Sequence, residues 1–465
     1  MVLAIISDLH FTEEGSSAVS GVSSGASRNL HPEAFRLFFA WLTTMARRNV
    51  ASRIDLVFAG DVFDLHRTAM WFGGDLRPWE TDPAHQEALG RRALEILNTI
   101  AGEEWVDQAL DAIRRFAGGE YIALNGDERA VGLPVHVHFV PGNHDRLVAC
   151  FPACRRRVRE LLGMGPSDEP FPTHLLFAEE RTLVRHGHEY DRYNFSRDLG
   201  RRRGPIPAQL SRDSYLAPAF GDLVTVDVAA RLPGLFRRHY GDRIARSTLL
   251  RALDGRLRAF DDVRPQSALA RFLLEGAGDG VTPGRAWRAL EPVVLQLLEE
   301  LAVNDTLNRW LRRLDARWRP DLIDLVQAAL GLRVWRGGIP YGVVRKLLSR
   351  ASKETAEERA AFLAAREKVV RENRVRLVVA GHTHHPGVHA LPGSRDSAPL
   401  YIDTGTWRRR ILGTADGTGF AELKSLAAVT VYGPDEDPGQ TPRSGKEISF
   451  DFWDGLTRHF FVDGA

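Results

Sequence analysis

The stretch Leu56–Leu65 reads Leu-Val-Phe-Ala-Gly-Asp-Val-Phe-Asp-Leu, and our interpretation of the fold starts from it. An apolar run of this length that is closed by a glycine is typical of a buried strand that opens into a loop. Here Gly60 closes the run, and Asp61 is the first charged side chain after it. The stretch therefore predicts a buried strand whose end presents a carboxylate.

Four further apolar runs have the same design, because each is followed closely by Asp, Asn or His. These runs, with the polar residues that follow them, are Met1–Ile6 with Asp8 and His10, Val135–Val140 with Asn143 and His144, Leu183–Arg185 with His186, and Leu377–Ala380 with His382 and His384. Functional side chains of α/β proteins gather where strands end. We therefore expect these residues to meet at one rim, with Asp61 at its centre.

The composition is that of an ordinary globular chain and excludes few functions. The chain has 465 residues, 44% of them hydrophobic and 26% charged, and a net charge of +2 that gives no strong attraction to nucleic acid or membranes. No apolar run approaches the ~20 residues of a membrane span, and the first residues lack the basic region of a signal peptide. We expect a cytoplasmic protein without a transmembrane segment.

The pattern of expected elements changes at residue 193 and again near residue 348. Residues 1–192 and 349–465 alternate apolar strands with helices, whereas residues 193–348 show helical periodicity without a clear strand. We expect an α/β core in two parts, interrupted by a mainly helical insertion or cap. The helices expected in the insertion are Leu232–Tyr240, Ala245–Phe260, Ala268–Leu274, Ala286–Ala302 and Thr306–Ala316.

The expected insertion is rich in arginine. Residues 195–264 contain 14 arginines, 8 aspartates and no lysine. This excess either meets an acidic substrate such as a phosphate ester or forms a solvated basic face. Outside the insertion, Leu147–Leu162 is expected to be one helix with Cys150 and Cys154 on one face, and the Ser- and Gly-rich Phe11–Leu30 is expected to be a mobile rim or surface loop.

The side chains at the rim are of the types that a dinuclear metal site requires. A carboxylate between two ions, flanked by neutral imidazoles and oxygen donors, lowers the pKa of a bridging water and holds a phosphoryl group. The candidate metal ligands are Asp8, His10, Asp61, Asn143, His186, His382 and His384. A lone Asp-x-His or His-x-His indicates little, but five such blocks in order, each after an apolar strand, favour one metal site.

These blocks resemble the motifs of the calcineurin-like metallophosphoesterases. The matching motifs are Asp8-x-His10, Gly60-Asp61-x-x-Asp64, Gly142-Asn143-His144-Asp145, His186-Gly187-His188 and Gly381-His382-x-His384. The resemblance covers roughly residues 1–195 and 370–410, and it implies a four-layer αββα sandwich with the metal site at the strand ends. The motifs are most similar to those of the UDP-2,3-diacylglucosamine diphosphatase-like branch, from which the chain differs by its insertion and by His144.

The resemblance also implies a role for each residue. The first metal would be held by Asp8, His10, Asp61 and His384, and the second by Asp61, Asn143, His186 and His382. In the reaction, Asp61 would bridge the metals and His144 would assist the phosphoryl oxygen or the leaving group. Asp64, Asp145 and His188 would orient the ligands from behind, and Arg146 is a candidate for binding phosphate.

The sequence therefore predicts a metal-dependent phosphoesterase, in which a hydroxide activated by two metal ions hydrolyses a phosphodiester, pyrophosphate or phosphomonoester bond. We expect two divalent ions, Mn²⁺ first, with Fe, Zn or Mg as alternatives. The expected substrate is a phosphorylated small molecule or a nucleotide-type molecule. One alternative is a nuclease whose basic insertion follows a DNA or RNA backbone. The other is a catalytically inactive scaffold on the same fold, and the sequence does not indicate the oligomeric state.

Overall fold

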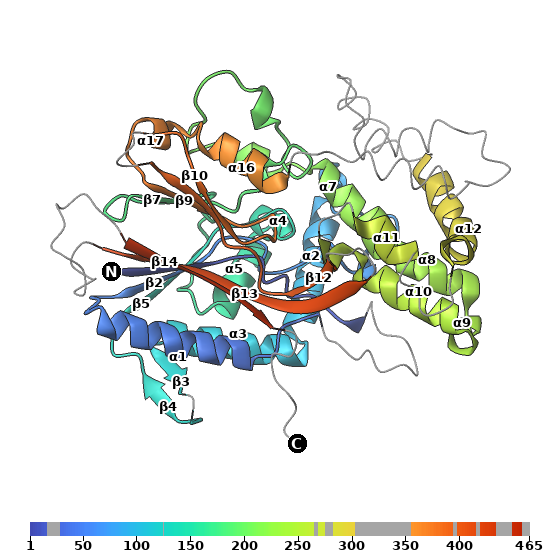
Figure 1. The fold of residues 1–465 in the computed structure, drawn as a ribbon, viewed down its shortest axis with the longest axis horizontal. Coiled ribbons are helices and arrows are strands. Elements are labelled where there is room, and N and C mark those ends of the chain that lie inside the picture. Colours follow the sequence, from blue (N-terminus) through green and yellow to red (C-terminus); the bar gives the residue numbers. More distant parts are fainter. Residues whose placement is uncertain are drawn as a thin grey trace.

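Two β-sheets form the centre of the molecule, and helices surround them (Figure 1). The computed structural model describes residues 1–15, 28–123, 125–264, 268–274, 282–302, 355–393, 398–414, 419–433 and 449–457. The fold is a mixed α/β fold, which confirms the fold class predicted from the alternating strands and helices. Thr306–Ala316 and most of Phe11–Leu30 lie outside the described residues, so the expectations for them stay predictions.

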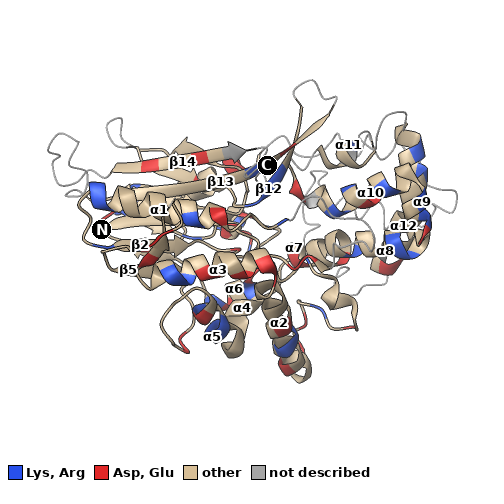
Figure 2. Ribbon diagram, turned by 90° about the horizontal axis from the view of Figure 1, so that it is seen from below, with Lys and Arg blue, Asp and Glu red and all other residues tan. Residues whose placement is uncertain are grey.

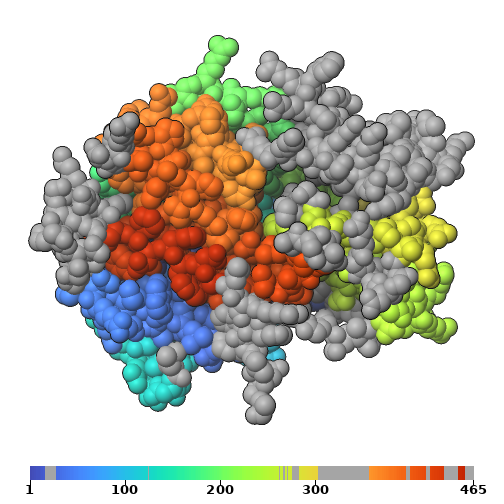
Figure 3. Space-filling view, in the orientation of Figure 1, coloured from blue at the N-terminus to red at the C-terminus, as the bar shows by residue number. Residues whose placement is uncertain are grey.

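Seven described strands form the larger sheet, in the order β5-β2-β1-β13-β12-β8, with β14 paired to β13. Their bounds are β1 Val2–Ile6, β2 Ile54–Phe58, β5 Val135–Phe139, β8 Val263–Arg264, β12 Arg409–Gly413, β13 Phe420–Tyr432 and β14 Ser449–Thr457. Strands β1, β2 and β5 are parallel, and β13 runs antiparallel to β1. In Figure 3, red residues of this C-terminal part lie directly beside the blue residues of the N-terminal part.

Five described strands form the second sheet, in the order β10-β11-β9-β7-β6. Their bounds are β6 Leu175–Phe177, β7 Thr182–Val184, β9 Leu377–Ala380, β10 Gly387–Ala390 and β11 Leu400–Asp403. Strands β7, β9 and β11 are parallel, so the carboxyl ends of β7 and β9 point to one edge. A separate hairpin pairs β3 Glu120–Ile122 with β4 Glu128–Ala130.

The two sheets pack face to face because both faces of their strands are apolar. Along each strand, successive side chains point to opposite faces, so one set lies between the sheets and the other faces the helices. Leu3 and Ile5 of β1 pack with Val379 of β9 and Ile402 of β11 between the sheets. The intervening residues of β1 face away from the second sheet and belong to the core that α1 and α3 cover. The outer face of the second sheet packs on α16 and α17. Helices therefore cover the outer side of each sheet.

The helices that cover the sheets lie before residue 162 and after residue 355. Their bounds are α1 Glu33–Arg48, α2 Gln86–Ala101, α3 Glu104–Ala117, α4 Arg146–Cys150, α5 Pro152–Leu161, α16 Ala356–Ala364 and α17 Lys368–Arg371. The single helix expected over Leu147–Leu162 is wrong. The chain is extended at Phe151, because a residue before proline avoids the helical conformation, and Cys150 and Cys154 therefore lie on different helices.

Helices α7 to α12 form a second group to one side of the sheets (Figure 1), whereas α6 packs against α4. Their bounds are α6 Arg212–Leu216, α7 Phe220–Leu223, α8 Arg231–Tyr240, α9 Arg243–Arg246, α10 Thr248–Ala259, α11 Leu269–Leu274 and α12 Pro283–Ala302. One expected helix, Ala245–Phe260, is in fact two. The break falls at Ser247, whose hydroxyl accepts a hydrogen bond from the backbone N–H of Leu250 and so caps α10.

This helical segment also contributes a strand, which the sequence did not predict. Strand β8 is only two residues long and pairs in parallel with β12 at the edge of the larger sheet. The preceding residue, Asp262, is buried and forms ion pairs with Arg408, just before β12, and with Arg409, the first residue of that strand. The segment is therefore joined to the sheet by backbone pairing and by a buried ion cluster. The boundaries at residues 192 and 348 stay predictions.

No helix within the described ranges is long and apolar enough to cross a membrane.

Candidate metal centre

The predicted metal ligands follow directly after strands of the two sheets. Asp8 and His10 come after β1, Asp61 after β2, Asn143 after β5, His186 after β7, and His382 and His384 after β9. Backbone hydrogen bonds hold these loops to one another: Asp8 N–H donates to Gly60 O at 3.0 Å, and Gly381 N–H donates to His186 O at 2.7 Å. The bond between Asp8 and Gly60 joins the ends of β1 and β2 in the larger sheet. The bond between Gly381 and His186 joins the ends of β9 and β7 in the second sheet.

Five of these residues have a backbone conformation that non-glycine residues rarely adopt. The φ angles are 53° at Asp8, 46° at His10, 50° at Asp61, 76° at His382 and 60° at His384. Each such conformation costs about 1–3 kcal/mol and persists where the surrounding structure imposes it, often at functional sites. Their concentration at the predicted ligands indicates that the fold positions these side chains at the expense of local backbone stability.

Two glycines of the motifs are required because carboxylates pack against them. A Cβ atom at Gly142 would lie 2.1 Å from Asp61 Oδ1, and one at Gly381 would lie 2.1 Å from Asp8 Oδ2. Both distances are far below any van der Waals contact. These glycines therefore let the neighbouring loops approach the two central carboxylates closely.

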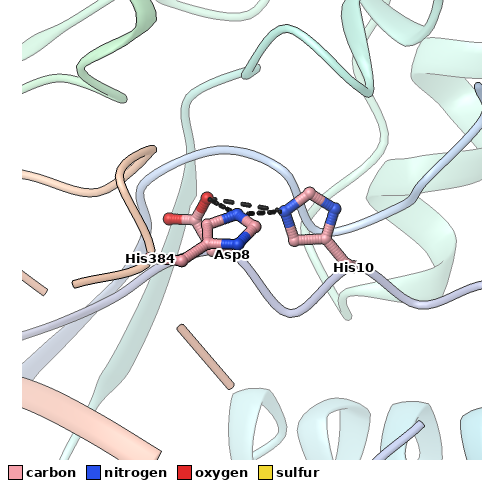
Figure 4. A group of neighbouring side chains, drawn as sticks. All are labelled: Asp8, His10 and His384. Carbon is pink, nitrogen blue, oxygen red and sulfur yellow. Dashed lines mark hydrogen bonds and ion pairs between the residues drawn. The ribbon is translucent and has the colours of Figure 1, made fainter. Parts of the chain in front are cut away.

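Three groups of side chains are close enough to hold a metal ion. These groups are Asp8 with His10 and His384, His10 with Asp61 and His144, and Asp61 with His186 and His382. Figure 4 shows the first group, whose three side chains converge on one point. In this group His384 Nε2 lies 3.2 Å from Asp8 Oδ1 and 2.9 Å from His10 Nε2. Asp61 belongs to the other two groups and so connects the cluster.

The side of Asp61 away from β1 carries a second set of donors. His186 Nε2 lies 3.2 Å from Asp61 Oδ2 and 3.2 Å from the amide oxygen of Asn143. On the opposite side, His10 Nε2 lies 3.7 Å from the same carboxylate oxygen. The structure thus brings all seven predicted ligands into one cluster, with Asp61 between two sets.

The central carboxylates fit a cation because each has a buried oxygen that faces imidazole nitrogens and accepts no hydrogen bond in the described parts of the chain. Asp8 Oδ1 and Asp61 Oδ2 accept no hydrogen bond among the described residues. Burial by itself would raise the pKa of Asp61, but the nearby charges of His186 and His144 hold that pKa well below its usual range. A buried carboxylate that stays ionised with a bare oxygen is suited to binding a positive ion.

Two of the imidazoles have the orientation typical of metal ligands. His10 Nδ1 lies 3.2 Å from Asp64 Oδ2, and His186 Nδ1 lies 2.8 Å from the carbonyl oxygen of Ala59. Each Nδ1–H can donate to its partner, so that a neutral ring has its Nε2 lone pair directed at the carboxylates. These hydrogen bonds fix both the tautomer and the ring plane.

Three further predicted residues support the cluster from behind. Asp64 also contacts Nδ1 of His144 at 2.8 Å, and Asp145 accepts hydrogen bonds from the backbone N–H groups of Gly142 and Val62. Burial and the charge of Asp61 raise the pKa of Asp145 to about 7. The ring of His188 packs against that of His186 at 5.2 Å, and burial lowers its pKa to about 4.

His144 lies at the open side of the cluster, with 17% of its side chain exposed. Burial alone would lower its pKa, but the carboxylates of Asp64 and Asp61 outweigh burial and raise the pKa to about 9. Its Nδ1 faces Asp64, whereas its Nε2 has no hydrogen-bond partner among the described side chains. Without bound metal, the ring is therefore cationic at neutral pH and can donate a proton.

The structure adds two side chains that sequence reasoning missed. Asp191 Oδ2 lies 3.2 Å from His382 Nε2, and Arg264 donates a hydrogen bond to His384 Nδ1 at 2.8 Å. Burial and the charge of Arg264 hold the pKa of His384 well below its usual range, which keeps this ring neutral. Because Nδ1 accepts the hydrogen bond from Arg264, the ring proton lies on Nε2, which faces Asp8. No local motif marks either residue, because each contact joins distant parts of the chain.

The loop after β11 also holds the first ligand in place. The Thr406 hydroxyl and the Trp407 N–H both donate to the carbonyl oxygen of Asp8, at 2.7 Å and 3.1 Å. Ser7 contacts both Asp8 and Thr404.

Arg146, the predicted phosphate-binding residue, points to a different partner. Its guanidinium pairs with Asp222 at 2.8 Å and donates to the carbonyl oxygens of Pro78 and Leu216. These contacts join α4 to α7 of the helical segment. The structure therefore places Arg146 in a buried ion pair and not in the ligand cluster.

No protein-family model matches the chain, and no curated protein is significantly similar to it. The interpretation of the site therefore rests on its residues and their geometry. Those residues form buried groups that could hold a metal ion.

Substitution of Gly142 by Ala tests whether the close approach of the loops serves metal binding. The added Cβ displaces the Asp61 carboxylate, so we expect Gly142→Ala to bind Mn²⁺ at least about tenfold more weakly than the wild type in calorimetric titrations. Gly165→Ala is the matched control, because nothing lies within 4 Å of a Cβ at that position. Folded Gly142→Ala protein with wild-type affinity would contradict this role.

Metal binding is expected to release protons. Burial alone would lower the pKa of His186, but Asp61 and Asp8 raise it to about 10, so the ring is protonated at pH 7 when no metal is bound. A metal binds only neutral imidazole, so the affinity for Mn²⁺ should rise with pH up to about 10. At pH 7, binding should release about one proton per chain from His186. Titration calorimetry in buffers of different ionisation enthalpy measures this number.

The controls for proton release are two histidine variants. We expect His186→Asn to release fewer protons on binding Mn²⁺, whereas His136→Asn, altered at an exposed position, should behave as the wild type. Mn²⁺ binding without proton release in any buffer would show that His186 is not a ligand.

Proposed function

We propose that this protein is a metal-dependent phosphoesterase of the calcineurin-like type. The observation that carries the proposal is the position of Asp61, which belongs to two of the groups that could hold a metal ion. A carboxylate between two such groups is the arrangement that a dinuclear hydrolytic site needs.

The architecture supports the same proposal. The two sheets pack face to face, helices cover their outer sides, and the candidate ligands lie where β1, β2, β5, β7 and β9 end. This is the arrangement expected for the four-layer metallophosphoesterase sandwich. The spacing of the five motifs along the chain agrees with it.

Two divalent ions are part of the proposal, with Mn²⁺ as the first candidate and Fe, Zn or Mg as alternatives. One would be held by Asp8, His10, Asp61 and His384, and the other by Asp61, Asn143, His186 and His382. When bound, such ions activate water and polarise a phosphoryl group. The bare oxygens of Asp8 and Asp61 and the orientation of His10 and His186 fit ligands of this kind.

His144 is the residue that we assign to the leaving group. Asp64 contacts its Nδ1 and raises its pKa, and the side chain is partly exposed beside the cluster. A proton on Nε2 can pass to the departing oxygen as the bond to phosphorus breaks. Asp64 contacts His10 as well, so one carboxylate orients a candidate ligand and the proton donor together.

Arg264 brings a positive charge from the helical segment to the edge of the cluster, where it contacts His384. A guanidinium at this position can bind the non-reacting oxygens of a phosphate ester and offset charge that develops on them. The substrate that we propose is accordingly a phosphorylated small molecule or a nucleotide-type molecule with a phosphodiester or pyrophosphate bond.

The two alternatives fit the structure less well. A nuclease needs a basic groove that leads to the cluster, and two arginines beside the larger sheet, Arg408 and Arg409, are instead buried in ion pairs with Asp262. An inactive scaffold would keep two ionised carboxylates in its interior, each with an oxygen that accepts no hydrogen bond from a described residue, without a function that offsets their cost.

Hydrolysis of bis(4-nitrophenyl) phosphate in the presence of Mn²⁺ tests the proposal. We expect wild-type activity and at least about a hundredfold loss in Asp61→Asn, because the variant loses a ligand charge at the centre of the cluster. His136→Ala, a substitution at an exposed position outside the cluster, is the control and should keep wild-type activity. Equal activity of Asp61→Asn and wild type would overturn the assignment.

The role of His144 is tested by comparing two leaving groups. His144→Ala should lose roughly 10²–10⁴-fold in kcat on a substrate with an alkoxide leaving group, and much less on the nitrophenyl ester, whose leaving group needs no proton. An equal loss on both substrates would show that His144 acts in another way.

A further inference from the structure

A pocket of about 480 Å³ lies within the helical segment, outside the metal centre. It is formed by α9, the start of α10 and the first turns of α12. None of the residues that line it is a candidate metal ligand or contacts one. Its most prominent side chains are four arginines, Arg243, Arg246, Arg285 and Arg288.

The four arginines reach the pocket in two pairs. Arg243 and Arg246 are three residues apart on α9, and Arg285 and Arg288 are three residues apart on α12. Residues with this spacing lie on the same face of a helix. Two helices therefore direct a pair of guanidinium groups at one space. Figure 2 shows lysine and arginine gathered at this end of the molecule, over α8, α9 and α12.

The charge of this pocket is not balanced by neighbouring carboxylates. No acidic residue lines it, and none of its four arginines forms an ion pair with a carboxylate in the described parts of the chain. Other arginines of the same segment are paired: Arg237 and Arg258 contact Asp254, and Arg231 contacts Asp227. All four arginines of the pocket are exposed, so their charge is accessible to an anion that enters the pocket.

The lining suits a phosphate-bearing anion. Guanidinium groups bind phosphate oxygens through paired hydrogen bonds, and the Ser247 hydroxyl lies in the same pocket. Leu249, Leu250 and Ala289 supply apolar surface beside the charges, and the volume lies within the range of roughly 300–1,000 Å³ of small-ligand sites. Charged oxygens attached to a partly apolar body match this combination.

We propose that this pocket is a second binding site of the protein and that it takes the phosphate groups of a nucleotide. The nucleotide is either free or part of a single strand of nucleic acid, since both present the same oxygens. The proposal stands on the helical segment alone, and it holds whether or not the metal centre hydrolyses phosphate esters.

The test measures binding of two probes to the full chain in buffer with EDTA, so that the metal centre cannot hold a phosphate through metal ions. The probes are ATP, followed by calorimetry, and a fluorescent 12-nucleotide oligo(dT), followed by anisotropy at low salt. The pocket variant is Arg243→Gln/Arg285→Gln, which removes one arginine from each helix. Arg203→Gln/Arg238→Gln is the matched control, because it removes the same charge at exposed positions outside the pocket.

We expect at least one probe to bind the wild type and the control, and to bind the pocket variant at least about tenfold more weakly. Binding of ATP identifies a free nucleotide as the ligand, and binding of oligo(dT) alone identifies a strand. Asp61→Asn should keep the wild-type affinity for the probe, which separates this site from the metal centre. Binding of neither probe by the wild type, or equal affinities of the pocket and control variants, would overturn the proposal.

Discussion

The buried negative charge of Asp8 and Asp61, whose ion-pair partners within the described residues are imidazoles, is the constraint on which the rest of the structure depends. Both carboxylates are buried, both stay ionised, and each keeps one oxygen that accepts no hydrogen bond within the described residues. A buried carboxylate in this state is stable only if positive charge lies close to it. The imidazoles around Asp61 supply that charge when they are protonated, and a metal ion would supply it when they are neutral. The cluster therefore has two states in which its negative charge is neutralised: one with protonated imidazoles and one with bound metal.

Both states require the side chains to be held in position by the backbone. The left-handed conformations at Asp8, Asp61 and His384 cost free energy, and the large buried core around the strands is what maintains them. Asp145 contributes directly, because its carboxylate accepts N–H groups from the Asp61 loop and from the Asn143 loop. The packed core of the two sheets therefore fixes the positions of the loops at the strand ends, and these loops carry the candidate ligands.

Much of the site could be predicted from the sequence because its signals are local. Each ligand lies within a few residues of an apolar strand, and parallel strands bring their ends together, so Asp61 and His186 were predicted from their own neighbourhoods. Contacts between distant segments could not be predicted in this way. Arg264 and His384 are 120 residues apart, and Asp191 and His382 are 191 apart.

Contacts between distant segments also explain why strand β12 and the position of Arg146 were not predicted correctly from the sequence. Strand β12 begins with Arg409 and Arg410, which no apolar pattern marks as a strand. It lies in the sheet because Asp262, from the helical segment, neutralises Arg409 there. Arg146 was a candidate for phosphate until the structure showed its pair with Asp222, also from the helical segment. Charged residues of the two parts of the chain are thus paired with one another, and neither part alone reveals the pairing.

The most direct test of a metal centre built on Asp61 is anomalous diffraction from crystals grown with Mn²⁺. The account predicts two manganese peaks, one on the side of His10 and one on the side of His186, with the Asp61 carboxylate between them. It also predicts the loss of at least one peak in Asp61→Asn crystals. Wild-type crystals at saturating Mn²⁺ without a peak in this cluster would contradict the account.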